Sequence, residues 1–311
     1  MKDRKTSIRI IALAMAMLVA SSATVATSAA TISSNQLAVM QSSLDSDGRV
    51  YQTLKSISDK KLSKYSRLTV TVGTKTLSVK GFIANGTVYI PFRAAAGAIP
   101  NSKYDYTYST GTSVMTAPGL ELSASNGCYV TYANGRTLFN TTPNVIMNDG
   151  RLYIPANVFA KAVGMSVEVS STDINISGSY NPLTHADKFY RQDEVFWLAR
   201  IIHAESKGEP LIGQIAVGNV VLNRVRSAYY PNTIYGVIFD RKYGVQFSPV
   251  LDGSIYNTPG YNSILAAKIC LEGYDVSDGA FFFLAPNLAT SSWIPRNREY
   301  AFTIGGHDFY Y

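Results

Sequence analysis

The stretch from Trp197 to Arg226 reads WLARIIHAESKGEPLIGQIAVGNVVLNRVR, and it decides how the second half of the chain folds. Its first apolar residues recur at helical spacing, and an acidic residue completes the same face: Leu198, Ile201, Ile202 and Glu205. A Ser-Lys-Gly break follows, and a second apolar run begins after Glu209-Pro210. The stretch therefore predicts two helices joined by a tight turn, with one acid at the end of the first apolar face.

Glu205 is the leading candidate for a catalytic residue. A carboxyl group that continues an apolar helix face loses hydration, and this loss raises its pKa toward neutrality. Such a group donates a proton near pH 7 and takes it back, as a general acid and base must do. Glu209 instead lies at the start of the second helix, where the helix dipole stabilises a negative charge. His203 lies off the apolar face, and His-Ala-Glu is not the spacing of a helical zinc motif.

The chain of 311 residues, 46% of them hydrophobic, is long enough for about two domains with substantial cores. Residues 1–30 have a basic start, an apolar run and a small-residue cleavage site, which is the pattern of a secretory signal peptide. The apolar run is short for a membrane span, which needs about 20 residues. Cleavage near Ala29 or Ala30 would remove four basic and one acidic side chain and lower the net charge from +7 to about +4. We therefore expect an exported protein, secreted or wall-associated, with no membrane anchor after cleavage.

The charge pattern indicates which classes of binding partner to expect. No basic stripe of the kind that binds nucleic acid is present. The mild positive charge suits an anionic cell-wall polymer and suits plain solubility equally well.

Residues 31–66 are rich in Ser and Lys without a strong period, which favours a tether. Cys128 and Cys270 fall in different predicted domains, which favours two small buried hydrophobic residues over a disulfide.

An internal repeat organises the first half of the chain. NGTVYIP at 85–91 returns as DGRLYIP at 149–155. In each copy a turn leads into a strand, and the proline stands where a short helix starts. We expect these helices over 92–98 and 156–163, the second ending at Gly164.

Further β-structure surrounds the repeat. Residues 68–72 and 76–79 predict a hairpin, and residues 120–123 and 129–132 predict two more short strands. Polar segments with Gly and Pro between residues 170 and 182 then mark a domain boundary.

The duplicated pattern resembles the copper amine oxidase N-terminal-like domain, over residues 67–178. The resemblance implies a small α+β module of exported wall-associated proteins, which either binds the wall or substrate or acts as a spacer. It does not imply copper, because the span contains no histidine and one cysteine and so lacks the usual ligand set. We expect no cofactor.

The C-terminal motifs carry a second resemblance. Around the two predicted helices the chain reads ARIIHAESKGEP at 199–210 and VLNRV at 221–225. More blocks follow in order: YPNTI at 230–234, QFSPV at 246–250, FFLAP at 282–286 and IGGHDF at 304–309. Residues 185–311 thereby resemble the SleB/CwlJ family of cell wall hydrolases, the spore cortex-lytic enzymes. The Leu-Ala-Pro at 284–286 departs from the Tyr/Phe-Asn-Pro that is more usual there, so we expect one substrate-side contact to differ.

This resemblance implies cleavage of peptidoglycan glycan strands between N-acetylmuramic acid and N-acetylglucosamine, by lytic transglycosylation in the better-understood members. It puts Glu205 at the position of the family's catalytic glutamate. A true hydrolase would normally need a second carboxylate, for which Asp240 and Asp252 are candidates. Asp252 also fits a turn that shapes the cleft. The other residues expected to bind substrate each have a packing alternative: Gln246, Ser248, Tyr256 and Trp293.

The sequence as a whole predicts an α+β protein of two domains. The first is the duplicated β-rich module at 67–178. The second, at 185–311, is a mainly helical, lysozyme/transglycosylase-like catalytic domain with a small sheet from 281–284 and 302–304. Its expected partner is the peptidoglycan of the spore cortex, degraded in germination, or of the vegetative wall; a regulatory protein partner stays open.

Two other functions compete with glycan cleavage. One is a zinc-dependent N-acetylmuramoyl-L-alanine amidase, which needs a metal-ligand set where the chain offers only His185, His203 and His307. The other is a non-catalytic wall-binding protein that retains the Glu205 motif.

Overall fold

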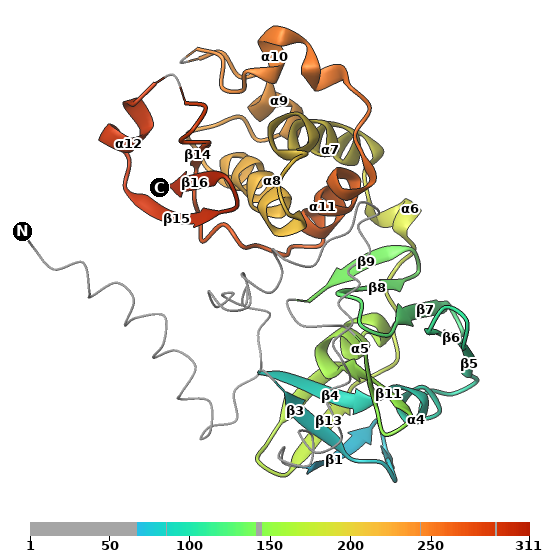
Figure 1. Ribbon diagram of the computed structural model, residues 1–311. Helices are drawn as coiled ribbons and strands as arrows, with labels where there is room; N and C mark the ends of the chain where they lie inside the picture. Colours follow the sequence, from blue (N-terminus) through green and yellow to red (C-terminus); the bar gives the residue numbers. More distant parts are fainter. Residues whose placement is uncertain (1–66, 85, 141–144, 243, 290) are drawn as a thin grey trace, which may run out of the picture.

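The computed structural model describes residues 67–84, 86–140, 145–242, 244–289 and 291–311, and these are β-rich up to residue 177 and mainly helical from residue 186 (Figure 1). The predicted signal peptide and tether, residues 1–66, lie outside the described part. Within it, no helix has both the length and the apolar character that crossing a membrane requires.

The largest sheet of the β-rich half is built around the repeat. Its order is β10-β11-β4-β3-β1-β13-β12, with β2 paired to β1. The strands are β1 (Arg67–Val72), β2 (Lys75–Thr76), β3 (Gly81–Ala84), β4 (Thr87–Pro91), β10 (Ile146–Asn148), β11 (Arg151–Pro155), β12 (Ser166–Val169) and β13 (Asp173–Ser177). Strands β4 and β11, one from each copy, pair antiparallel with Ile90 opposite Ile154. The two copies therefore meet side by side at the centre of their shared Tyr-Ile-Pro, and the predicted duplication is confirmed.

Each repeat strand leads directly into its helix. α4 (Phe92–Ala96) ends two residues earlier than expected, whereas α5 (Ala156–Val163) has the expected bounds. Gly164 ends α5 in the left-handed conformation, at φ 70°. A Cβ there would lie 1.7 Å from the Asn181 carbonyl oxygen, so only glycine fits.

A second sheet covers the other side of these helices (Figure 1). It is an antiparallel meander of β5 (Lys103–Thr107), β6 (Thr112–Ala117), β7 (Leu120–Ser125), β8 (Val130–Ala133) and β9 (Arg136–Phe139). Phe92, Phe159 and Met115 are fully buried in the core that the two sheets and the two helices share. The strands expected at 120–123 and 129–132 form as β7 and β8, whereas β6 was not predicted, although buried residues alternate along both β6 and β7.

The helical half is centred on α8 (Leu211–Arg226), which is buried from its first residue to Arg224. Around it lie α6 (Ala186–Phe189), α7 (Gln192–Ser206), α9 (Ile234–Ile238), α10 (Pro249–Asp252), the 3₁₀ turn η1 (Ser254–Tyr256), α11 (Tyr261–Leu271) and α12 (Trp293–Asn297). Both helices of the opening stretch form, but Pro210 precedes α8 as its N-cap instead of opening its first turn. Gly218 lets the helices approach closely, because a Cβ there would lie 2.8 Å from both Cys270 Sγ and Ile202 Cδ1.

The small sheet has three strands, not the two expected. β14 (Phe282–Leu284), β16 (His307–Tyr310) and β15 (Tyr300–Ile304) lie in that order, so the unpredicted strand is the central one. The Gly305-Gly306 turn folds the C-terminal residues back onto β15. A strand of four residues after two glycines gave no period long enough to recognise.

Glu272, just after α11, ties the two halves together. Its carboxylate accepts two hydrogen bonds of 2.8 Å from the Arg136 guanidinium, one of 3.2 Å from Lys161 Nζ and one of 2.9 Å from the Tyr190 hydroxyl. Its side chain is 3% exposed. Although burial alone would raise the pKa of Glu272, the hydrogen bonds from Arg136 and the charge of Lys161 lower it. A buried, fully paired carboxylate thus joins the β-rich half to the end of α11. Cys270 of the same helix is buried, and no disulfide joins it to Cys128.

Candidate active site

Glu205 lies in the last turn of α7 and is only partly exposed. Its helix packs against α8 through Ile201 and Ile202, both fully buried, so the face that carries Glu205 is turned toward the core. Burial and, to a lesser extent, the negative charge of Asp252 raise the pKa of Glu205 to about 7, although the positive charge of Arg224 opposes the rise. Near neutral pH this carboxyl group therefore exists in both its protonated and its ionised form.

Asp252 is the second carboxyl group of the site. It ends α10 and is exposed, and its Oδ1 accepts a hydrogen bond of 2.8 Å from the Ser254 backbone N–H. Hydrogen bonds from the side chain and backbone of Ser254 lower the pKa of Asp252. Gly253 follows in the left-handed conformation, so the pair forms the expected Asp-Gly turn. The pKa of Glu205 is thus raised, and the pKa of its neighbour Asp252 is lowered. Near neutral pH, Asp252 stays ionised while Glu205 can carry a proton, so the two carboxyl groups suit different roles.

Arg224 places a buried positive charge near Glu205. Its side chain comes from α8, is 5% exposed and donates a 2.8 Å hydrogen bond from Nε to the Phe281 carbonyl oxygen. Its guanidinium also lies 5.1 Å from the centre of the Phe247 ring and 5.4 Å from that of Phe282. Burial lowers the pKa of Arg224, and the charges of Asp240 and Glu205 act against that. Asp240, a candidate second carboxylate, therefore interacts with Arg224.

Trp293 is connected to this centre through ring and cation contacts. The Arg298 guanidinium lies 5.3 Å from the centre of the Trp293 ring and 4.4 Å from that of Phe282, on which Arg224 also acts. Trp293 opens α12 and is more than half exposed. Because the Phe282 ring of β14 contacts both Arg298 and Arg224, it links Trp293, the predicted stacking residue, to the surroundings of Glu205.

The remaining predicted site residues lie on the loops between α9 and α11. Gln246 is half-buried and donates from Nε2 to the Gly244 carbonyl oxygen at 3.0 Å, while the adjacent Phe247 contacts Arg224. Ser248 is exposed, and its carbonyl oxygen accepts the first hydrogen bonds of α10. Tyr256 is exposed in η1, with its ring centre 6.3 Å from that of Trp197. All three therefore belong to the segments that flank Asp252, and their contact with substrate stays a prediction.

Glu209 is held by a contact that the sequence did not reveal. It lies before α8 rather than in its first turn, and its Oε2 accepts a hydrogen bond of 2.8 Å from the Gly306 backbone N–H. The buried His307 has Nδ1 3.6 Å from Glu209 Oε1. Glu209 thus anchors the β15–β16 turn to the start of α8, and this tertiary role replaces the helix-dipole role expected for it.

His203 faces away from the carboxyl groups, toward α11. Its Nδ1 accepts a hydrogen bond of 3.3 Å from the Gly260 backbone N–H, and burial lowers its pKa. Within the described ranges, no three His, Cys, Asp or Glu side chains come together in a group that could hold a metal ion.

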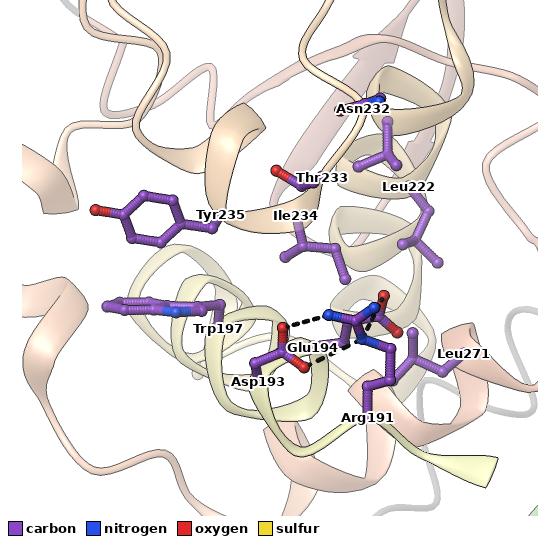
Figure 2. A pocket seen from close by; sticks show the side chains of 11 residues that line it. Arg191, Asp193, Glu194, Trp197, Leu222, Asn232, Thr233, Ile234, Tyr235 and Leu271 are labelled. Carbon is purple, nitrogen blue, oxygen red and sulfur yellow. Dashed lines mark hydrogen bonds and ion pairs between the residues drawn. The ribbon is translucent and has the colours of Figure 1, made fainter.

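A pocket of about 230 Å³ lies at the opposite end of α7 (Figure 2). Arg191 and Asp193 form an ion pair on one wall, and the rings of Trp197 and Tyr235 lie beside one another at the edge. Glu205 is not among its lining residues. Because α7 rises about 1.5 Å per residue, the pocket wall at Arg191 is roughly 20 Å along the helix from Glu205. This pocket is therefore separate from the carboxyl groups of Glu205 and Asp252.

Comparisons with known proteins match each half of the chain. Residues 208–310 match the family model described as cell wall hydrolase, and residues 70–177 match the model of the copper amine oxidase N-terminal domain. The first range begins three residues after Glu205, so the matched segment does not itself include the catalytic candidate.

Curated relatives match the C-terminal half. A spore cortex-lytic enzyme of Bacillus cereus is 40% identical over 129 residues, covering 42% of this chain and 48% of that protein. The spore cortex-lytic enzyme of Bacillus subtilis is 36% identical over 120 residues, covering 39% of this chain and 38% of that protein. This chain therefore spans about half or less of the length of these relatives.

One solved structure is similar over the same half. The catalytic domain of the germination-specific lytic transglycosylase SleB from Bacillus anthracis is 40% identical, and the match covers 39% of this chain and 97% of that chain with a TM-score of 0.36.

Proposed function

We propose that this chain, whose C-terminal half belongs to the cell wall hydrolase family, cleaves the glycan strand of peptidoglycan with Glu205 as its general acid and base. The observation that carries the proposal is the pKa of Glu205, raised to about 7 by burial at the end of α7. A carboxyl group with that pKa can both give and accept a proton at neutral pH. The bond we assign is the one between N-acetylmuramic acid and N-acetylglucosamine.

The reaction we propose is a transglycosylation within the muramic acid residue. Glu205 donates its proton to the glycosidic oxygen while the bond between that oxygen and the anomeric carbon breaks. The 6-hydroxyl oxygen of the same sugar then bonds to the anomeric carbon, and its proton passes to Glu205. The products are a free 4-hydroxyl on N-acetylglucosamine and a 1,6-anhydro ring, and no water is consumed. One acid that returns to its starting state is sufficient for this sequence.

Asp252 supports the same reaction as a fixed negative charge. Its lowered pKa keeps it ionised where Glu205 is protonated, and the anion stabilises positive charge that develops on the sugar ring. If the enzyme instead hydrolysed the bond, Asp252 would be the group that activates water. The two outcomes differ in their products, since hydrolysis leaves a reducing end and transglycosylation leaves an anhydro end.

The relatives' names support a proposal for the substrate and its setting. Because several relatives are spore cortex-lytic enzymes, we propose the spore cortex as the substrate and germination as the occasion. We propose a signal peptide over residues 1–30, export to the wall or spore, and domains at 67–178 and 185–311. The β-rich domain then binds the wall or sets the distance between the wall and the cleft.

The test is digestion of purified cortex and vegetative sacculi by the wild-type chain and by Glu205→Gln, with mass spectrometry of the released fragments. We expect anhydro-muramic ends from the wild type and at least a hundredfold less release from the variant, since general acid–base catalysis contributes about 10²–10⁴-fold. Glu168→Gln, an exposed carboxyl on β12, is the matched control and should release normal amounts. Stem peptides freed from intact glycan would establish an amidase instead, and binding without release would establish a wall-binding protein. Either result refutes the proposal.

A further inference from the structure

A band of aromatic side chains lies beside α7, between the turn that carries Asp252 and the pocket at the start of the helix. Trp197 is at its centre, with ring centres 5.3 Å from Tyr235, 5.2 Å from Phe239 and 5.0 Å from Phe196. Tyr256 adds a fourth neighbour at 6.3 Å. We call these five residues the aromatic band. They come from α7, α9 and η1 and from the position directly after α9.

The band is unusually exposed for large apolar side chains. Tyr256 is 63% exposed, Tyr235 54% and Phe196 44%, while Trp197 and Phe239 are half-buried and support the other rings. Most single exposed aromatics need no explanation, but a contiguous group on one surface marks an interaction site. The two inner rings hold the outer rings in place, so the surface is preformed rather than assembled on binding.

The near end of the band lies beside the Asp252-Gly253 turn, because the Tyr256 backbone N–H donates a hydrogen bond of 3.1 Å to the Gly253 carbonyl oxygen. Tyr256 lies four residues after Asp252, and Phe239 directly precedes Asp240, whose charge acts on Arg224. Trp197 and Glu205 are eight residues apart on α7, which corresponds to about 12 Å along the helix. A long ligand whose cleaved bond lies at Glu205 therefore passes over the band if it follows the helix toward its start.

The far end of the band offers polar groups beside the rings. The Trp197 and Tyr235 rings border the pocket, whose other walls include the ion-paired Arg191 and Asp193 and the exposed Asn232 (Figure 2). Aromatic faces next to charged and amide groups suit a ligand with both apolar ring faces and many hydroxyl or acetamido groups. A purely apolar partner would displace the water that hydrates Arg191, Asp193 and Asn232 and would offer no hydrogen bonds in its place.

We propose that the aromatic band is a second binding surface for the glycan strand, which it holds on one side of the bond cleaved at Glu205. The assignment rests on the proposed function for the class of ligand. Sugar rings stack on the exposed faces of Tyr256 and Tyr235, and the hydroxyl and acetamido groups of the distal sugars reach the polar pocket wall. The band therefore favours long strands over short fragments, and it keeps the enzyme on the polymer after each cleavage.

The two tryptophans of the chain, Trp197 and Trp293, allow a direct test. In a chain that carries Glu205→Gln to prevent cleavage, the part of the emission change that is lost in an added Trp197→Phe substitution comes from Trp197, and Trp293 stays in place as a predicted substrate contact. Soluble glycan strands freed of stem peptides and sorted by length are the probe. We expect long strands to change the Trp197 emission and short fragments of a few sugars to leave it unchanged.

Tyr235→Ala in the same background should weaken the binding of long strands roughly two- to tenfold, the range for loss of one aromatic contact of 0.5–1.5 kcal/mol, and leave short fragments unaffected. Tyr261→Ala is the matched control, because Tyr261 on α11 is 55% exposed, against 54% for Tyr235, and lies outside the aromatic band. Its affinity for long strands should stay within twofold of the parent.

The band would be overturned as a glycan surface if long strands bound without changing the Trp197 emission and with equal affinity for Tyr235→Ala. Emission that follows protein concentration instead of glycan, as in self-association, would also overturn it. Absence of any strand binding would overturn it as well. The wild-type digestion separates this inference from the proposed function. A chain that cleaves sacculi but fails the Trp197 test refutes the band alone. A chain that binds strands through Trp197 but releases no fragments refutes the catalytic proposal alone.

Discussion

Replacing Glu205 by glutamine should stabilise the folded chain at alkaline pH and not at acid pH. The pKa of Glu205 in the folded protein, about 7, lies above the usual 4.5 of the unfolded chain because burial disfavours the ionised form. Between these two values the folded state binds more protons than the unfolded state, so stability falls as pH rises through the window from about 4.5 to 7. Glutamine removes the charge and with it this loss.

The size of the effect follows from the same two values. A difference of one pH unit between folded and unfolded pKa corresponds to about 1.4 kcal/mol, so a rise from 4.5 to about 7 corresponds to at most about 3 kcal/mol above pH 8. Partial exposure of the carboxyl group lets water reduce the cost, so we expect a gain of about 1–3 kcal/mol at pH 9 and about zero at pH 4. For domains of this size, 1 kcal/mol moves the melting temperature by roughly 2–4 °C.

Urea denaturation of the wild type and of Glu205→Gln at pH 4 and pH 9 measures this difference. Asp193→Asn is the control of opposite sign. The hydrogen bond from Arg191 lowers the pKa of Asp193, so removing the charge of Asp193 should not raise the free energy of unfolding at high pH. Equal stability differences for Glu205→Gln at both pH values, or a destabilisation at pH 9, would show that the carboxyl group is not held in a desolvating site. The catalytic argument from its pKa would then fail.

Two further predictions rest on the pKa of Glu205 and on Glu272. Because Glu205 must be protonated to act as the acid, initial rates of release from sacculi should fall about tenfold per pH unit above roughly pH 7; a rate profile that falls already near pH 5 contradicts the assignment. Glu272→Ala leaves the buried Arg136 without its carboxylate and should cost about 3–5 kcal/mol in urea denaturation. Arg136→Met combined with Glu272→Leu should recover much of that stability, and an unchanged Glu272→Ala protein would mean that the two halves are not joined through this residue.

Local patterns predicted the elements well wherever the period was long. The apolar spacing from Leu198 onward predicted α7 and α8, and the duplicated Tyr-Ile-Pro predicted two strand–helix units, because burial of one face imposes its period on the sequence. The same logic placed Glu205 on the buried side of α7. Its raised pKa is the consequence that the pattern implied.

Contacts between distant segments left no comparable pattern. Arg224 stands in the apolar run that predicted α8, yet only the packing of β14 and of the segment before α10 against α8 places Phe282 and Phe247 around its guanidinium. The aromatic band was missed for the same reason, since Trp197, Tyr235 and Tyr256 come from three separate elements. Strand β16 was missed because four residues are too short to display a period.

The sequence by itself determined that the chain is β-rich in its first half and helical in its second half. It also determined the helix pair α7 and α8 and the acid at the end of α7, because each of these features depends on residues within a few turns of one another. Only the tertiary structure decided what surrounds that acid. Glu205 meets Asp252 and Arg224 through the packing of α10 and α8, and Glu209, its near equal in sequence, is drawn to Gly306 at the far end of the chain. Electrostatic environment is a sum over neighbours in space, and those neighbours are chosen by how the helices pack rather than by their order along the chain.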